Sequence, residues 1–193
     1  MFQLVRPAVL LSAMALATAA CGSSGTPSAG TSQPPTSSSA STPAPAGTSS
    51  SPVLDVTGCP SASTVGSAFG GADLPAPTTV SGFSSALPAG ATGIGCSYLS
   101  SNHDVIINLI DGYPASDFSA SEGAVDSNVG HTLAFSPISG LGTEAVSYTW
   151  TSPIYGPAVG VIVQDGTSHV SVYAAGLSAT VAQVTGLASQ LLS

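Results

Sequence analysis

The residues of this chain that could take part in acid–base chemistry are three histidines and nine carboxylates. A small secreted hydrolase would need one histidine, His131 or His169, with a carboxylate behind it and a nucleophile such as serine in front. Serine is so abundant here that such a set can be assembled by chance, and neither GxSxG nor HExxH occurs. We therefore assign no catalytic residue and keep hydrolysis as the alternative function.

The charge of the chain excludes several other functions. Arg6 is the only Lys or Arg among the 193 residues, and the formal net charge is −8 at pH 7. Nucleic acids are bound mainly through Lys and Arg, so we expect no nucleic-acid partner. The stretch Gly140–Ala145 fits the pattern GxGxxA, but we expect a strand after it, where a dinucleotide site needs a helix. No spacing of His, Cys or carboxylates indicates a metal site, and we expect neither a metal nor a cofactor.

The N-terminus predicts where the protein is located. An apolar run follows Arg6 and ends at Cys21, which is typical of a signal peptide over residues 1–20. The small residues before Cys21 resemble the lipobox of bacterial lipoproteins, although Thr18 replaces the usual branched aliphatic residue. The resemblance implies acylation of Cys21 and a lipid anchor at the extracytoplasmic face of the membrane. Cleavage of an ordinary secretory signal near Ala20 is the alternative.

The segment that follows has an unusual composition. Residues 22–52 are Ser, Thr, Pro, Gly and Ala apart from Gln33. A segment without branched aliphatic, aromatic or charged residues cannot bury enough apolar surface to fold, so residues 21–52 are predicted to be a lipidated, disordered stalk. The remaining residues, 53–193, have the length of a single globular domain.

The other two cysteines, Cys59 and Cys96, are predicted to form a disulfide. If Cys21 carries lipid, they are the only pair left, and exported proteins keep disulfides. Two free thiols, one of them a nucleophile, are the alternative.

Aromatic residues of the C-terminal half could form a ligand site. Tyr148, Trp150, Tyr155 and Tyr173, together with His169, could line a pocket for an apolar or glycan ligand. Such residues are also typical of a protein core or a sheet face, and both interpretations remain open.

The hydrophobic periodicity predicts the elements that would position these residues. Helices are expected over residues 61–69, 115–124 and 178–192, and strands over 94–99, 104–110, 131–135, 145–151, 158–164 and 167–174. A two-residue turn at Asp165-Gly166 would place Val161 opposite Val170, Val159 opposite Val172 and Ile162 opposite His169. The last helix should bury Val181, Val184, Ala188 and Leu191.

The order of these elements favours an α+β fold. Neighbouring strands with short turns predict an antiparallel sheet of about five to six strands, with two or three helices packed mainly on one face.

Short motifs resemble those of a known family. They are Cys59 at the start of the first helix, Cys96-Ser97-Tyr98, Gly140-Leu141-Gly142-Thr143-Glu144-Ala145 before a strand, and the closing amphipathic helix. Together they resemble a family of actinobacterial lipoproteins known as a domain of unknown function, with Tyr98 and Thr143 in place of the expected Trp and Asp. The glycine motif is also similar to one in sensor domains of actinobacterial receptor kinases.

The resemblance implies no catalytic residues. It favours a membrane-tethered lipoprotein that binds or senses an envelope ligand or a protein partner without catalysing a reaction.

Overall fold

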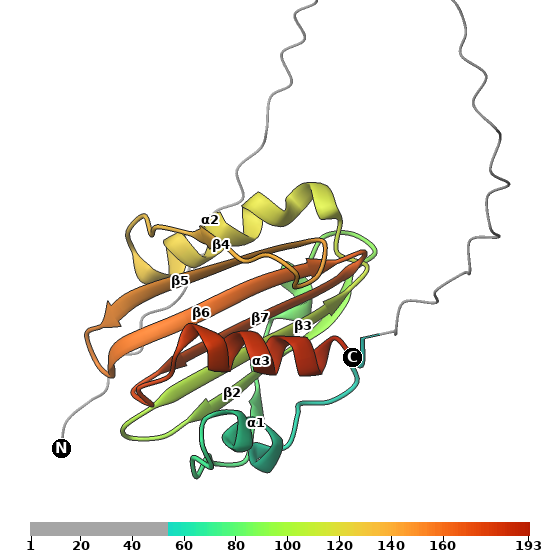
Figure 1. Ribbon diagram of the computed structural model, residues 1–193. Coiled ribbons are helices and arrows are strands. Elements are labelled where there is room, and N and C mark those ends of the chain that lie inside the picture. Colours follow the sequence, from blue (N-terminus) through green and yellow to red (C-terminus); the bar gives the residue numbers. More distant parts are fainter. Residues whose placement is uncertain (1–53) are drawn as a thin grey trace, which may run out of the picture. The chain divides into compact units, whose positions relative to one another are not determined.

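The computed structural model of the protein describes residues 54–193 (Figure 1). The predicted signal peptide over residues 1–20, the acylation of Cys21 and the stalk over residues 21–52 lie outside the described residues. Within the described part, no helix has the length and apolar character needed to cross a membrane.

A single antiparallel sheet forms the centre of the domain. Its seven strands lie in the order β1-β2-β3-β7-β6-β5-β4. The strands are β1 (Thr78–Thr79), β2 (Thr92–Leu99), β3 (Asp104–Asp111), β4 (Ser136–Pro137), β5 (Glu144–Ser152), β6 (Gly156–Asp165) and β7 (Ser168–Ala175). The predicted α+β class is confirmed. The strand count exceeds the prediction because β1 and β4, at the two edges, are two residues long and leave no periodic pattern in the sequence.

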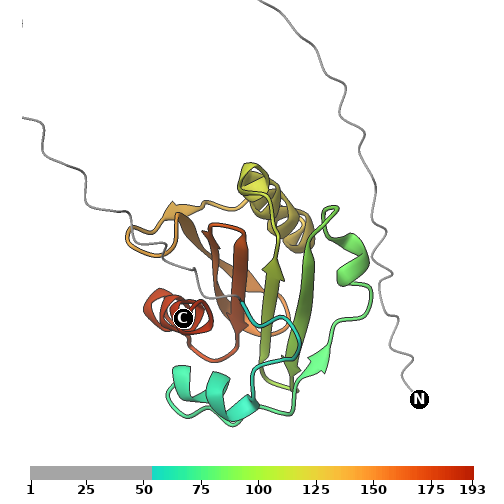
Figure 2. The same ribbon diagram turned by 90° about the vertical axis from the view of Figure 1, so that its right-hand side faces the viewer.

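Helices cover both faces of the sheet. They are α1 (Ala62–Ala68), α2 (Phe118–Val129) and α3 (Val181–Leu191), with short 3-10 turns η1 (Ser84–Ala86) and η2 (Ala115–Asp117). Figures 1 and 2 show α1 and α3 on one face, so most of the helical cover lies on one side, as predicted. The opposite face carries α2.

The two faces have separate cores. Alternate residues of the central strands, such as Val105, Ile107 and Leu109, point toward α1 and α3 and form the larger core with Val184 and Leu187. The smaller core lies under α2, where Phe118 packs with residues of β5 and β6, namely Val146, Tyr148 and Ile162.

The predicted disulfide is present. Cys59 and Cys96 are bonded, with Cα atoms 5.6 Å apart, across a sequence separation of 37 residues. The bond joins the chain just before α1 to β2. The hydroxyl of Tyr98, also on β2, donates a hydrogen bond to the carbonyl of Pro60. Two bonds therefore hold the entry of the chain against the sheet.

The predicted strand over residues 131–135 is wrong. Only Ser136 and Pro137 pair with β5, opposite Ser147 and Val146. Residues 131–135 are instead held by α2, because the backbone N–H of Leu133 donates to the Asp126 carboxylate at 2.8 Å.

The β6–β7 hairpin turns one residue later than predicted. Asp165 pairs with Ser168, so Gly166 and Thr167 form the turn. Gly166 takes a φ of +60° while Thr167 does not have a positive φ, as in a type II′ turn with glycine first. The pairing is therefore shifted by two residues: Val161 lies opposite Val172, and His169 lies opposite Gln164 instead of Ile162. Because the shift is even, every side chain stays on its predicted face.

The last helix is shorter than predicted and rotated. Thr180 and Gln183 form a capping box, so α3 begins at Val181 and not at Ser178. Of the residues predicted to be buried, Val184 and Ala188 are buried, Leu191 is half-buried, and Val181, in the first turn, is 37% exposed; Leu187, which was not predicted to be buried, is 1% exposed.

Two glycine substitutions are expected to change stability in opposite directions. Gly186→Ala in α3 should raise the free energy of unfolding by about 0.5–1 kcal/mol, since its Cβ would meet no atom and glycine is a poor helix former. Gly160→Ala in β6 should lower it by about 1–3 kcal/mol, because its Cβ would overlap the Tyr148 ring. Urea denaturation of the two variants tests this. A stabilised Gly160→Ala variant would contradict the packing described for Tyr148.

Candidate functional site

Trp150 and Tyr173 meet on the face of the sheet that carries α2. Their ring centroids are 6.4 Å apart, with the ring planes inclined at 32°. Both side chains are half-buried. The register places them at the end of the sheet where β5 and β7 end and β3 begins.

Other polar side chains surround the Tyr173 hydroxyl. Burial and the negative charge of Asp104 raise the pKa of Tyr173 to about 12, with a smaller contribution from Tyr155. Ser152 and Trp150 lie close enough to the hydroxyl to offset part of this rise. We call the group Asp104, Trp150, Ser152, Tyr155 and Tyr173 the sheet-end cluster.

The turn between β5 and β6 holds Tyr155 in this cluster. The Ser152 hydroxyl oxygen accepts the backbone N–H groups of Ile154 at 3.3 Å and Tyr155 at 3.2 Å. Ser152 is itself buried. The position of Tyr155 therefore depends on a buried hydroxyl and not only on the exposed loop.

Several buried polar atoms at this end of the sheet have no hydrogen-bond partner among the described residues. They are Nε2 of His103, Oδ1 of Asp104 and Nε1 of Trp150, which lies near the Tyr173 hydroxyl without the geometry of a hydrogen bond; the fourth such atom in the described part of the chain is Oγ1 of Thr185 in α3. Burial also raises the pKa of the Asp104 carboxyl, and the nearby His103 lowers it in part. Buried polar groups are normally paired, so this concentration of unpaired groups is unusual.

Two alanines separate Trp150 from Asp104 within the cluster. Trp150 pairs with Ala158, Ala158 pairs with Ala175, and Ala175 pairs with Asp104. These four residues form a row across four neighbouring strands. The large side chains of Trp150 and Asp104 are thus separated by two methyl groups.

Tyr148 belongs to the core and not to the cluster surface. It is 5% exposed, its ring contacts Phe135 at 5.6 Å between centroids, and burial raises its pKa. Its ring also fills the space above Gly160 on the next strand. Of the four aromatic residues predicted to line a pocket, the structure therefore brings together Trp150, Tyr155 and Tyr173.

His169 lies in a different environment, at the opposite end of the sheet. Its ring stacks on Tyr113 at 4.5 Å between centroids, and its Nδ1 lies 3.0 Å from Oε1 of the fully buried Gln164. The Gln164 amide nitrogen donates to the carbonyls of Tyr113 and Gly166. Its oxygen therefore accepts, and Nδ1 of His169 carries the proton. Burial lowers the pKa of His169 to about 4, so the ring is neutral at pH 7.

Neither histidine of the hydrolase hypothesis has a catalytic arrangement among residues 54–193. His169 is oriented by an amide where a triad has a carboxylate. His131 is exposed; its Nδ1 lies 3.2 Å from the Val129 carbonyl, and its ring contacts Trp150 at 6.1 Å between centroids. The described residues also contain no group of three or more His, Cys, Asp or Glu placed to hold a metal ion.

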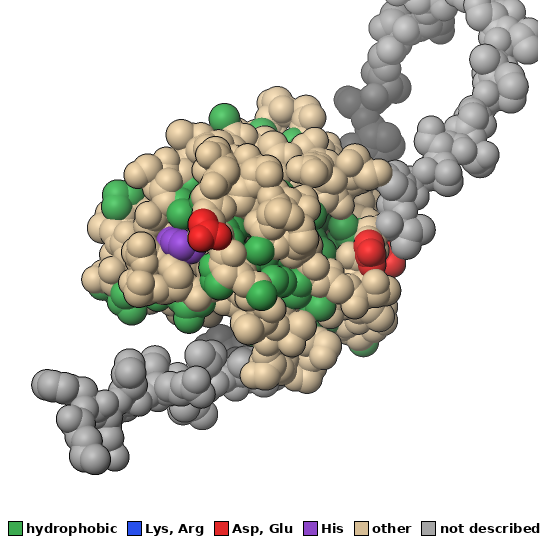
Figure 3. Space-filling model, turned by 90° about the horizontal axis from the view of Figure 1, so that it is seen from below, with side chains coloured by type: hydrophobic (Ala, Val, Ile, Leu, Met, Phe, Trp, Pro, Cys, Tyr) green, Lys and Arg blue, Asp and Glu red, His purple; other side chains and the backbone are tan. Residues whose placement is uncertain are grey.

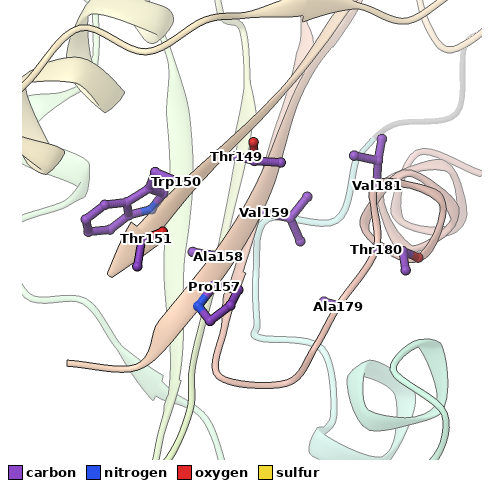
Figure 4. Close-up of a pocket in the computed structure, with 9 residues that line it drawn as sticks. All are labelled: Thr149, Trp150, Thr151, Pro157, Ala158, Val159, Ala179, Thr180 and Val181. Carbon is purple, nitrogen blue, oxygen red and sulfur yellow. The ribbon is translucent and has the colours of Figure 1, made fainter. Parts of the chain in front are cut away.

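A hollow of about 370 Å³ lies on the other side of β5, next to the start of α3. Figure 4 shows Val159 and Val181 facing each other across it, while the Trp150 ring points away to the other side of the strand. Thr149 and Thr180 add hydroxyl groups to the lining. The exposure of Val181, which the amphipathic pattern did not predict, results from this hollow.

The surface of the domain has little charge. The view in Figure 3 shows scattered hydrophobic side chains among uncharged polar ones, with a histidine and a few carboxylates. Since Arg6 is the only Lys or Arg of the chain, none occurs among residues 54–193. The described residues therefore offer no Lys or Arg side chain to a ligand.

Asp104 and Ser152 were not predicted to belong to the site. Asp104 opens β3 after a polar turn, and Ser152 closes β5, so each looks like an ordinary strand end. Only the strand order, which places β3 next to β7 and β6 next to β5, brings them to Tyr173.

Comparisons of the chain with protein-family models, curated proteins and solved structures found no match.

Proposed function

We propose that this chain is a lipid-anchored, extracytoplasmic binding module whose ligand site is the sheet-end cluster. The observation that carries the proposal is the concentration of unpaired buried polar atoms beside two aromatic rings at one end of the sheet. A ligand could provide partners for those atoms while it covers the rings. The lipobox-like sequence before Cys21 supports the anchor, and the stalk composition supports a spacer between membrane and domain.

The site favours binding over catalysis. Asp104 and Tyr173 are the titratable groups of the cluster whose pKa values are shifted, and in both cases burial is the largest cause of a rise. A Tyr173 pKa of about 12 leaves the phenol protonated at pH 7, which makes it a donor or acceptor and a poor base. The serine of the cluster, Ser152, has no histidine as a hydrogen-bond partner in the described structure.

Native mass spectrometry of the protein purified from its own membrane tests the proposal. We expect a covalent diacyl mass on the chain beginning at Cys21, and a noncovalently retained molecule on the domain. A double variant, Trp150→Ala with Tyr155→Ala, should keep the acyl mass and lose the retained molecule. Cys21→Ala should lose the acyl mass. An unacylated wild-type chain would refute the anchor, and a retained molecule unaffected by the double variant would refute the site.

A further inference from the structure

We infer that the sheet-end cluster binds a neutral saccharide. The inference rests on the proposed function and adds the chemical class of its ligand. It is carried by the kinds of polar atoms that lack partners, by the aromatic rings beside them and by the charge of the domain.

The unpaired atoms require a ligand that both donates and accepts hydrogen bonds. Nε1 of Trp150 can only donate, and the Asp104 carboxylate can only accept. A sugar hydroxyl does both, and the several hydroxyls of a saccharide can bridge through water to groups that lie beneath the surface. The Tyr173 and Tyr155 hydroxyls next to them can take either role.

The rings provide the apolar part of the recognition. Trp150 and Tyr173 are both half-buried, so each leaves part of its ring open on the α2 face. Large, stiff side chains with a polar tip suit a ligand that has an apolar C–H face and a rim of hydroxyls. Ala158 and Ala175 lie between Trp150 and Asp104 in the same row of the sheet, so no large side chain of that row stands between the two.

Charge excludes the acidic sugars and disfavours a cationic ligand. An anionic saccharide would meet the Asp104 carboxylate with no Lys or Arg in the domain to compensate. A quaternary amine would be attracted to the rings and to Asp104. Its ammonium group neither donates nor accepts a hydrogen bond, however, and choline has a single hydroxyl for the polar groups of the cluster where a saccharide has several.

Trp150 is the only tryptophan of the chain, so its fluorescence reports on the cluster directly. The probes are maltose, mannobiose and chitobiose as neutral disaccharides, digalacturonate as an anionic one, and choline as a cation. We expect at least one neutral disaccharide to change the Trp150 emission with saturation, and digalacturonate and choline to bind at least tenfold more weakly. The same affinities are measured by calorimetry, which does not depend on Trp150.

Substitutions locate the binding. Asp104→Asn replaces one hydrogen-bond acceptor of the cluster by a donor. It should lower the affinity for the neutral disaccharide at least tenfold, which is the effect of losing one charge-assisted hydrogen bond. Asp165→Asn is the matched control, because it removes a carboxylate beside the β6–β7 turn at the opposite end of the sheet. It should leave the affinity unchanged. Circular dichroism of each variant confirms that the sheet is intact.

Three results would overturn the inference. They are tighter binding of choline or digalacturonate than of any neutral disaccharide, no saturable response to the three neutral disaccharides, and equal affinities in Asp104→Asn and Asp165→Asn. The proposed function has a separate test, since a retained lipid, amine or peptide in the native mass spectrum would support the binding module and refute the saccharide.

Discussion

Replacing both Cys59 and Cys96 by alanine is expected to lower the free energy of unfolding by about 4 kcal/mol at 25 °C. A cross-link over 37 residues reduces the conformational entropy of the unfolded chain, and the loop-entropy model gives about 3.8 kcal/mol for this separation. Cys96 is fully buried, so loss of its sulfur also leaves a gap in the larger core. For a domain of about 140 residues, whose stability is commonly 5–15 kcal/mol, this is a large fraction.

The position of the disulfide explains why its loss should matter beyond entropy. The loop that it closes contains α1, the edge strand β1 and η1, which are joined to β2 by the two residue pairs of β1 and by a few further hydrogen bonds. Tyr98 provides one of them, through its hydrogen bond to Pro60. With the disulfide absent, that hydrogen bond and the packing of Leu54, Val65 and Phe69 must hold the entry of the chain.

Urea denaturation of the wild type and the double variant, each with and without reductant, measures this effect. Reductant should lower the stability of the wild type and leave that of the double variant unchanged. The comparison therefore separates the effect of breaking the disulfide from any other effect of reductant on stability. Tyr98→Phe removes only the hydrogen bond to Pro60 and should cost about 1–2 kcal/mol. A double variant within 1 kcal/mol of the wild type would show that the loop is held mainly by packing.

Much of the fold follows from local patterns in the sequence. The β2–β3 hairpin, the β5 alternation and the capped start of α1 each depend on neighbouring residues, and each is present within a few residues of its prediction. The prediction was wrong where a distant contact decides the structure. Residues 131–135 have strand-like alternation, but the Asp126 carboxylate of α2 takes the N–H of Leu133 and the segment forms no ladder.

The candidate site was predictable only in part, for the same reason. Trp150 and Tyr173 are on one face because side chains alternate along strands, and this alternation is visible in the sequence. That they meet depends on the order β7-β6-β5, in which β6 places only the small residues Ala158 and Gly160 in the rows between them. Asp104 joins them only because β3 pairs with β7, which is about 70 residues away along the chain. No local pattern encodes that pairing.

His169 shows how a small change in register alters the chemistry of a residue. With the turn at Asp165-Gly166, His169 would face Ile162; with the turn at Gly166-Thr167 it faces Gln164, whose amide is held by two backbone carbonyls. The pair Gln164–His169 is therefore part of the core between η2, α2 and the end of the sheet. His169, which was predicted to contribute to a ligand site, lies in the structure against the side chains of Gln164 and Tyr113.

The stability of the domain should therefore fall as the pH drops from about 6.5 to about 4. Burial lowers the pKa of His169 from 6.5 to about 4 in the folded protein. Between these values the unfolded chain binds a proton that the folded protein does not, so protonation favours unfolding. The loss is about 1.4 kcal/mol per pH unit and about 3 kcal/mol in total, and it stops growing below pH 4, where the folded form is protonated as well.

The difference between wild type and His169→Asn isolates this contribution, because the carboxylates titrate in both proteins. The asparagine amide can still donate to Gln164 but does not titrate. It also loses the stacking on Tyr113, which lowers stability equally at every pH. Urea denaturation at several pH values between 7 and 4 should show the two stabilities converging by about 3 kcal/mol as the pH falls.

His131→Asn, at an exposed histidine, should keep the wild-type slope, since His169 is still present. Parallel profiles for wild type and His169→Asn would mean that His169 accepts its proton in the folded state at little cost, and that the Gln164–His169 pair opens readily to water.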